Sequence, residues 1–143
     1  MTGWTARESG RVSLFLAAAM TGVLVIIGLA YDGAGQLRSL QRADDLAAEA
    51  ARSGGQVIDR ARAIEGGLKQ IDEPGARAAV DTYLAAAGGV LDHDVSFPVV
   101  DGEKQIQVRV RITYRRAMLG LFGFGTTVTV TGEATARALT GAP

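Results

Sequence analysis

The chain has 143 residues, fifteen basic and fifteen acidic side chains, and no cysteine. A balanced charge provides no overall field to attract nucleic acid, so we expect no nucleic-acid partner. The missing thiols exclude disulfides, thiolate catalysis and sulfur-based zinc sites. A chain of this length has room for one domain with a modest core.

An apolar run is the first feature along the chain. A short tail over residues 1–11 precedes residues 12–31, which carry no charged side chain. Twenty helical residues extend about 30 Å, which matches the hydrocarbon thickness of a bilayer. The sequence therefore predicts a transmembrane helix over residues 12–31, with the lipid bilayer as a partner.

The same run has a second interpretation, a cleaved secretory signal. Gly28 and Ala30 form a small-x-small cleavage pattern, and release near Ala30 would give a secreted or cell-surface binding domain. Signals usually have apolar regions of only about 7–15 residues, so the longer run favours retention. Arginines balance on the two sides, and we place the short tail in the cytoplasm and the domain outside because a short tail is easily held back.

Residues 32–55 continue as a predicted stalk helix. Its apolar residues recur at steps of three and four, at Leu37, Leu40, Ala43, Ala47 and Ala50. We expect Gly33 and Gly35 to loosen this helix at the membrane edge. Gly54 and Gly55 are expected to end it.

A second helix is predicted over residues 73–87. Asp72 can cap its start, and Pro74 is tolerated in its first turn. Gly88 and Gly89 can end it. Its apolar residues fall on one side at helical spacing, at Ala76, Ala79, Val80, Tyr83, Leu84 and Ala87.

Later segments have the period of two that is typical of strands with one buried face. The clearest alternation places apolar residues at Ile106, Val108, Val110, Ile112 and Tyr114. An earlier strand, with Val95, Phe97 and Val99, joins it through Asp101 and Gly102, which is a strong hairpin signal. Pro98 places that earlier strand at an edge of the sheet. A last strand presents Val128, Val130, Ala134, Ala136 and Ala138.

These elements predict an α+β fold of pilin-like type. It has a long N-terminal transmembrane and stalk helix, one further amphipathic helix, and a small antiparallel sheet of about three strands. Residues 56–143 form one exported domain, in which residues 56–71 are ambiguous and suggest at most a short helix. The sheet is expected to bury its apolar face against both helices.

The chemistry of catalysis is mostly absent from the sequence. The single histidine, His93, lies in the run LDHD, and adjacent residues entering a strand point to opposite faces and rarely converge on a metal. We interpret LDHD as a polar turn. Asp44 and Asp45 are helix neighbours rather than a facing acid and base. We therefore expect no enzyme, no metal or other cofactor, and no small-molecule substrate.

The connection RRAMLGLFGFGT, between two predicted strands, is unusually apolar. Surface connections rarely gather so many apolar side chains, here Met118, Leu119, Leu121, Phe122 and Phe124. Two interpretations remain open. The segment folds back as a short helix and closes the core, or it forms a docking surface for the membrane interface or a partner subunit, with Arg115 and Arg116 beside it.

The order of elements resembles TadE/TadG-like proteins of the tight-adherence (Flp-type) pilus assembly system. The resemblance is carried by RESGRVSLFLAAA, GLAYDGAGQLRSLQRADDLAAEAAR, ARAAVDTYLAAAG and LGLFGFGTTVTVTGEATAR. It implies a pilin-like protein, held by an N-terminal helix in the inner membrane, that builds or joins a surface pilus as a minor pilin or pseudopilin. Its partners would be other pilin-like subunits or the assembly machinery. An anchored enzyme accessory or sensor domain is the rival from another class.

The resemblance also suggests a processing site. Some family members are cleaved after a glycine that precedes the apolar run, and they carry a glutamate at the fifth mature position. Gly10 matches that glycine, but Phe15 stands where the glutamate would be. We therefore predict that most molecules keep Gly10.

Overall fold

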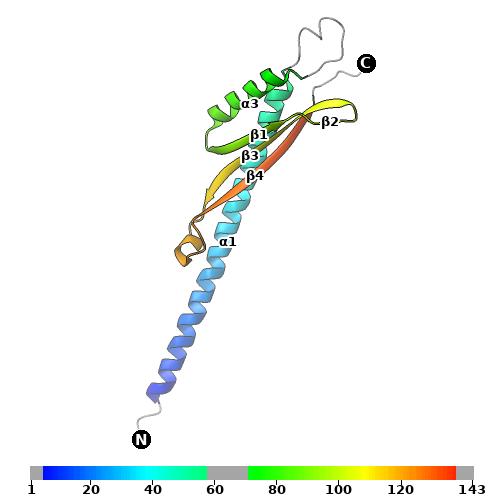
Figure 1. The fold of residues 1–143 in the computed structure, drawn as a ribbon. Coiled ribbons are helices and arrows are strands. Elements are labelled where there is room, and N and C mark those ends of the chain that lie inside the picture. Colours follow the sequence, from blue (N-terminus) through cyan, green and yellow to red (C-terminus); the bar gives the residue numbers. More distant parts are fainter. Residues whose placement is uncertain (1–4, 58–70, 138–143) are drawn as a thin grey trace, which may run out of the picture.

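The computed structural model describes residues 5–57 and 71–137 (Figure 1). The helices are α1 (Thr5–Gly55) and α3 (Glu73–Ala87), with a short 3₁₀ helix η1 (Leu119–Phe122). The strands are β1 (Val90–Ser96), β2 (Val99–Val100), β3 (Glu103–Arg115) and β4 (Thr127–Arg137). The predicted α+β class, with a long N-terminal helix and a small antiparallel sheet, is confirmed.

The dominant element is α1, a single helix of 51 residues that extends for about 77 Å at 1.5 Å per residue. Figure 1 shows the sheet and α3 gathered on its C-terminal half, while its N-terminal half projects alone. It ends at Gly55, as predicted. The expectation that Gly33 and Gly35 loosen the helix is wrong, because the helix passes through both without a break.

The sheet is built around β3, which pairs with β1 and β2 along one edge and with β4 along the other, always antiparallel. Pro98 separates β1 from β2, so the predicted edge strand is divided in two and the sheet has four strands. The register of β1 against β3 shifts between Val90 and Asp92.

The predicted hairpin turn between β2 and β3 is present. Asp101 and Gly102 both have positive φ angles, of 53° and 81°. This is the conformation that a two-residue hairpin turn of the favoured primed type requires, and it suits aspartate followed by glycine. Val100 then pairs with Glu103 directly across the turn.

The core lies between the sheet and the C-terminal half of α1. Its helical side is made of small residues, since Ala43, Ala47 and Ala50 are fully buried. Its sheet side is the alternating face of β3, with Ile106, Val108, Val110 and Ile112 buried. The last predicted strand follows the same parity from Val128 to Ala136, whereas Ala138 lies outside the described residues.

Two glycines allow the sheet and α1 to approach closely. A β-carbon on Gly132 would lie 2.2 Å from the backbone carbonyl carbon of Ala43. A β-carbon on Gly54 would lie 2.4 Å from Cδ1 of Ile106. The atoms at Gly132 belong to the α1 backbone, so glycine is required there for the observed packing, whereas at Gly54 the Ile106 side chain would have to move.

The second helix follows the sequence signals closely. Asp72 occupies the N-cap position and Pro74 the first turn, although the Asp72 side chain makes no capping hydrogen bond. Gly88 ends the helix with a positive φ of 68°. Arg77 ties the helix to β1, since its guanidinium donates to the backbone oxygen of Val95 at 2.8 Å. Residues 58–70, most of the ambiguous segment, lie outside the described residues.

Candidate functional site

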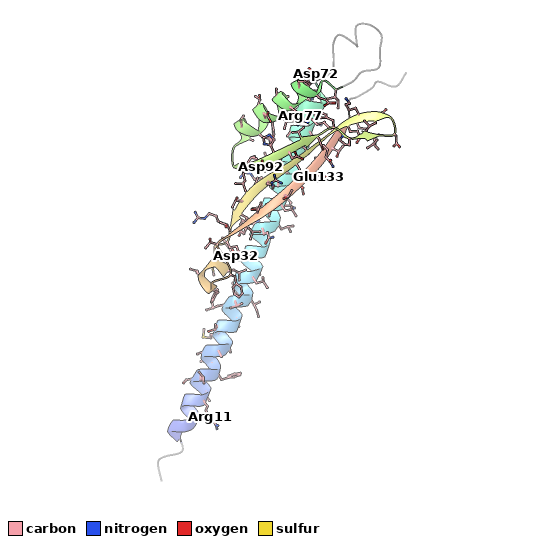
Figure 2. All side chains as sticks on the ribbon, in the orientation of Figure 1. Arg11, Asp32, Asp72, Arg77, Asp92 and Glu133 are labelled. Carbon is pink, nitrogen blue, oxygen red and sulfur yellow. The ribbon has the colours of Figure 1, made fainter. Side chains whose placement is uncertain are left out.

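The most distinctive polar feature is Asp32, which follows the apolar run directly and is only 2% exposed. It lies on α1 beside the connection between β3 and β4, which returns to the helix at this point (Figure 2). A buried carboxylate is costly unless it is hydrogen-bonded, so the partners of this group decide whether the arrangement is stable.

Asp32 accepts four hydrogen bonds, two at each oxygen. The backbone N–H of Ala117 donates to Oδ1 at 2.8 Å, and the Tyr114 hydroxyl donates to the same oxygen at 3.3 Å. The backbone N–H groups of Met118 and Leu119 donate to Oδ2 at 3.1 and 2.6 Å. These amides open the 3₁₀ helix η1, where unpaired N–H groups and the backbone dipoles favour a negative charge.

The protonation of Asp32 follows from the same contacts. Burial alone would raise the pKa of this carboxyl group, but the three backbone donors and Tyr114 stabilise the charged form and hold the pKa below its ordinary value of 3.8. Asp32 lies outside the uncharged run, and near neutral pH it is a carboxylate. Asp32 therefore caps the start of the connection. Its partner Ala117 lies 85 residues away in the sequence.

Small residues on α1 make room for this contact. Gly35 faces the Tyr114 ring, and a β-carbon there would lie 2.1 Å from the hydroxyl oxygen. Gly28 is buried, and a β-carbon there would lie 3.2 Å from Cβ of Met118. The connection is therefore fitted onto one face of α1 between residues 28 and 35, on both sides of Asp32.

The apolar connection forms the short helix that one of our interpretations required, but none of the η1 residues is buried. The other part of that interpretation, closing the core, is therefore wrong. Leu121 is 79% exposed and Phe124 is 58% exposed, while Phe122 is 40% exposed. Met118 and Leu119 are turned toward α1 at Gly28. The segment thus presents an exposed apolar tip, which we call the η1 tip (Leu121, Phe122 and Phe124).

The shape of the η1 tip is fixed by local backbone bonds. Gly123 ends η1 in the left-handed conformation, with φ of 82°. The backbone N–H of Phe124 donates a hydrogen bond to the backbone oxygen of Leu119 at 3.2 Å. The Arg116 guanidinium donates to the backbone oxygen of Phe124, and the neighbouring Arg115 is exposed.

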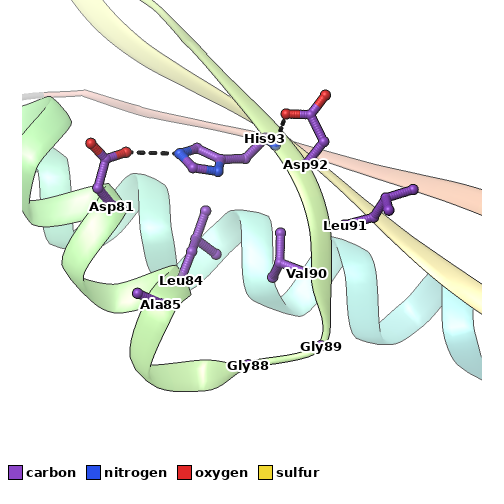
Figure 3. Close-up of a pocket in the computed structure, with 9 residues that line it drawn as sticks. All are labelled: Asp81, Leu84, Ala85, Gly88, Gly89, Val90, Leu91, Asp92 and His93. Carbon is purple, nitrogen blue, oxygen red and sulfur yellow. Dashed lines mark hydrogen bonds and ion pairs between the residues drawn. The ribbon is translucent and has the colours of Figure 1, made fainter.

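The run LDHD does not form the predicted polar turn; its residues lie within β1. Their side chains diverge: the Asp81 carboxylate accepts from His93 Nε2 at 2.7 Å, and Asp92 pairs with Arg111. Figure 3 shows the His93 side chain directed at Asp81, and both residues line an open pocket of about 240 Å³ between α3 and β1. Within residues 10–57 and 71–137, whose side chains the structure describes, no three His, Cys, Asp or Glu side chains gather as a metal site would require.

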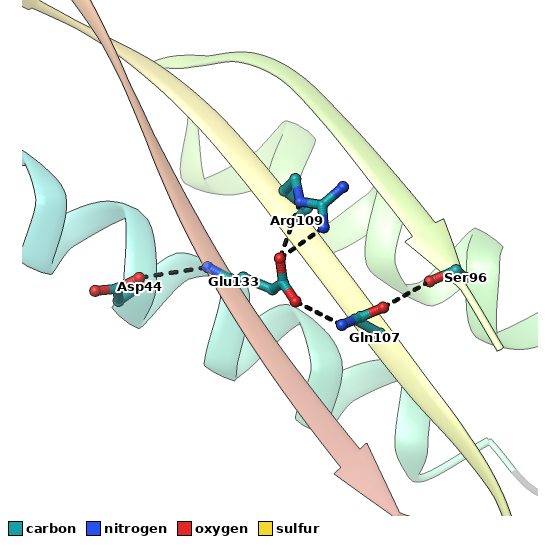
Figure 4. A network of polar contacts seen from close by, with 5 residues as sticks. All are labelled: Asp44, Ser96, Gln107, Arg109 and Glu133. Carbon is teal, nitrogen blue, oxygen red and sulfur yellow. Dashed lines mark hydrogen bonds and ion pairs between the residues drawn. The ribbon is translucent and has the colours of Figure 1, made fainter. Parts of the chain in front are cut away.

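The outer face of the sheet carries a polar network (Figure 4). Arg109 donates twice to Oε2 of Glu133, at 2.7 and 3.0 Å, and these bonds raise the pKa of Arg109 above its ordinary value. Gln107 donates to the other oxygen of Glu133 and accepts from the Ser96 hydroxyl. Asp44 contributes from α1, where its carboxylate accepts the backbone N–H of Glu133 at 3.3 Å. These groups hold the sheet together and fix it to α1.

The other predicted site residues lie on α1. Gly10 is exposed within the helix, with no atom near the position of a β-carbon. Ala30, the alternative cleavage position, is also exposed and helical, and lies between Gly28 and Asp32, which both touch the β3–β4 connection.

Sequence reasoning missed the role of Asp32 and of the glycines that surround it. The available signal was an acidic residue placed directly after an uncharged run, where a charge without partners would be unfavourable. The backbone amides that bind Asp32 belong to the apolar connection, which the sequence had already indicated as unusual. Pairing the two features would have suggested the contact.

Within the described residues, one helix, Gly10–Gly55, is long and apolar enough to cross a membrane, and its apolar stretch is almost entirely exposed. It is compatible with a single membrane span near the N-terminus. Comparisons with protein-family models, with curated proteins and with solved structures give no match to this chain.

Proposed function

We propose that the chain is a membrane-anchored, pilin-like component of a tight-adherence-type pilus or secretion apparatus and acts by protein assembly. The observation that carries this proposal is that one unbroken helix joins an exposed apolar run to the core of a small domain. Phe15 and Ile26 are 75% and 67% exposed, whereas Ala47 on the same helix is fully buried. A bilayer is the environment that suits such an exposed run.

The role in assembly is proposed from the anchor and the resemblance, while the polar side chains of the domain pair with one another. Glu133 is engaged by Arg109, Asp92 by Arg111, and His93 by Asp81. A catalytic site instead needs a nucleophile, a base and a place where a substrate meets both. The family resemblance of the sequence adds the more specific assignment to a pilus or secretion system.

The contacts of Gly28 and Asp32 favour retention of the anchor over release as a secreted domain. Both residues hold the β3–β4 connection, and they lie on opposite sides of the alternative cleavage position at Ala30. Cleavage there would cut α1 within the segment that carries the connection. For the orientation we rely on the short tail over residues 1–11, which is easily held back, and we propose that the N-terminus is cytoplasmic and the domain lies outside the membrane.

A labelling experiment tests this topology, and the absence of cysteine makes single-cysteine variants clean reporters. In intact cells, a membrane-impermeant maleimide should label Asp101→Cys, and it should label Thr2→Cys only after lysis. Both variants should sediment with membranes. Recovery of a soluble species that begins at Tyr31 would favour the secreted domain instead.

The assembly role needs a separate test in the host. Deleting the gene should reduce the number of surface pili seen by electron microscopy, and the full chain should restore it. Unchanged piliation would contradict the assignment. N-terminal sequencing of the restored protein should find Gly10 retained, and Arg11 as first residue would show processing.

A further inference from the structure

We propose that the η1 tip (Leu121, Phe122 and Phe124) is a lipid-binding surface that enters the outer interface of the same bilayer that holds α1. The inference rests on the proposed membrane anchoring and extends it. The domain would then contact the membrane at a second place besides its helix. The partner is the interfacial layer of phospholipid, with its head groups and upper acyl chains.

The depth of the segment along α1 is the first argument. Met118 packs against Gly28, which lies three residues inside the uncharged run that ends at Tyr31. Three helical residues correspond to about 4.5 Å along the axis. If residues 12–31 fill the hydrocarbon layer, the connection reaches the level where acyl chains meet head groups.

The position of the segment in the domain is the second argument. Figure 1 shows η1, in orange, at the end of the sheet that faces the free half of α1. Its side chains divide between two directions, because Met118 and Leu119 cover the helix while the tip is exposed. A surface built to close the core would bury Leu121, which instead is 79% exposed.

The order of side-chain types is the third argument. Met118 lies at Gly28, and further along α1 toward the domain come Tyr31 and then Tyr114, which faces Gly35. Aromatic rings with a polar end favour the interface. Arg115 is exposed beside them, where a guanidinium can donate to phosphate oxygens. Apolar side chains, tyrosines and a basic group in this sequence are typical of interfacial membrane binding.

Asp32 makes this placement possible at a water–lipid boundary. Its charge is met by four donors, so the connection can lie at the interface without an unpaired carboxylate. The three backbone amides that donate to Asp32 also orient the start of η1. Met118 and Leu119 are thereby held against α1, which fixes the height of the tip beside them.

Quenching by brominated lipids tests the proposal on the full chain in phosphatidylcholine vesicles. Trp4 is the single tryptophan, so Trp4→Phe gives a silent background for reporters. Leu121→Trp should lose most of its emission when the upper acyl chains are brominated. Leu91→Trp is the matched control, because Leu91 is an exposed leucine of β1, at 63%, away from the connection, and its emission should be unchanged.

A third reporter separates this proposal from the anchoring itself. Leu24→Trp lies in the middle of the uncharged run and should be quenched by lipids brominated deep in the chains. If it is not quenched, the membrane anchoring fails and the lipid surface fails with it. If Leu24→Trp is quenched but Leu121→Trp is not, the anchor stands and the lipid surface is overturned, as it would be if a protein partner covered the tip.

Discussion

The C-terminal (upper) and N-terminal (lower) halves of α1 differ both in composition and in surroundings, since residues 12–31 carry no charge whereas the upper half carries charged side chains on its exposed face. In the upper half, Ala43 and Ala47 are fully buried under the sheet, and the bulky Leu37 is left outside at 57%. In the lower half, large side chains such as Leu24, at 50%, point outward with no protein over them. Small residues on one face of the upper half let a sheet pack closely there, while the bulky apolar side chains of the lower half suit lipid.

The reason lies in how closely a strand can approach a helix. Alanine and glycine let the backbone of β4 reach the backbone of α1 at Gly132 and Ala43. Leucine, isoleucine and phenylalanine in the lower half would keep a strand further away. Those side chains suit a solvent that adapts to their shape, which a bilayer does.

The largest expected effect comes from adding one methyl group at the closest approach. Gly132→Ala would place a β-carbon 2.2 Å from the carbonyl carbon of Ala43, so β4 must move away from α1. We expect a loss of about 3 kcal/mol in the free energy of unfolding. Urea unfolding in detergent micelles, followed by circular dichroism, measures it.

The matched control for this change lies in the lower half. Gly22 has no atom within 4 Å of its β-carbon position, and Gly22→Ala should leave stability unchanged or raise it by up to about 1 kcal/mol. Equal destabilisation by the two variants would show that the halves do not differ as described.

A larger side chain in each half sharpens the comparison further. Ala47→Leu inserts three carbons into a fully buried position and should cost about 2 kcal/mol through overpacking. Ala18→Leu, on an exposed part of the lower half, should change stability by less than about 0.5 kcal/mol. Thermal unfolding of both variants in the same detergent checks the difference, and a stable Ala47→Leu variant would contradict the packing.

The boundary between the halves predicts a local effect. Asp32→Asn keeps the size of the side chain but replaces one acceptor oxygen with an amide donor, which faces backbone N–H groups. Hydrogen exchange of the amides of Met118 and Leu119 should accelerate severalfold, while the amides of the sheet stay protected. Asp45→Asn, at an exposed position, is the control and should change neither.

Lowering the pH should produce the smallest effect, again at Asp32. Because the pKa of Asp32 is lowered in the folded chain, its contribution is complete above 3.8 and is lost as the pH falls through the lower folded value. Emission from Leu121→Trp, in the Trp4→Phe background, should change in that acidic range. The change in emission should be absent when Asp32→Asn is also present. If the change persists in that double variant, it comes from the titration of another group.

Local signals in the sequence predicted much of the fold. The period of two in β3, the Asp101-Gly102 turn and the end of α3 at Gly88 each depend on neighbouring residues, and each is confirmed. LDHD was misread because charged residues suggest a turn, although in β1 they pair with side chains outside that strand, on Asp81 and Arg111.

Long-range contacts account for the rest. Gly35 was interpreted as a flexible point because its partner, the Tyr114 ring, is 79 residues away and invisible to local patterns. The same holds for Asp32 and the amides that bind it. The apolar connection could be singled out by composition, but the choice between core and surface needed the burial of its side chains.

The most direct test of the account compares Leu24 and Leu37, which are similarly exposed on the same helix at 50% and 57%. Spin labels on Leu24→Cys and Leu37→Cys, with the full chain in vesicles, report access to oxygen and to a water-soluble nickel chelate. We predict that Leu24→Cys is relaxed mainly by oxygen, which concentrates in lipid, and Leu37→Cys mainly by the nickel chelate. Strong relaxation of both labels by nickel would contradict a membrane span over residues 12–31.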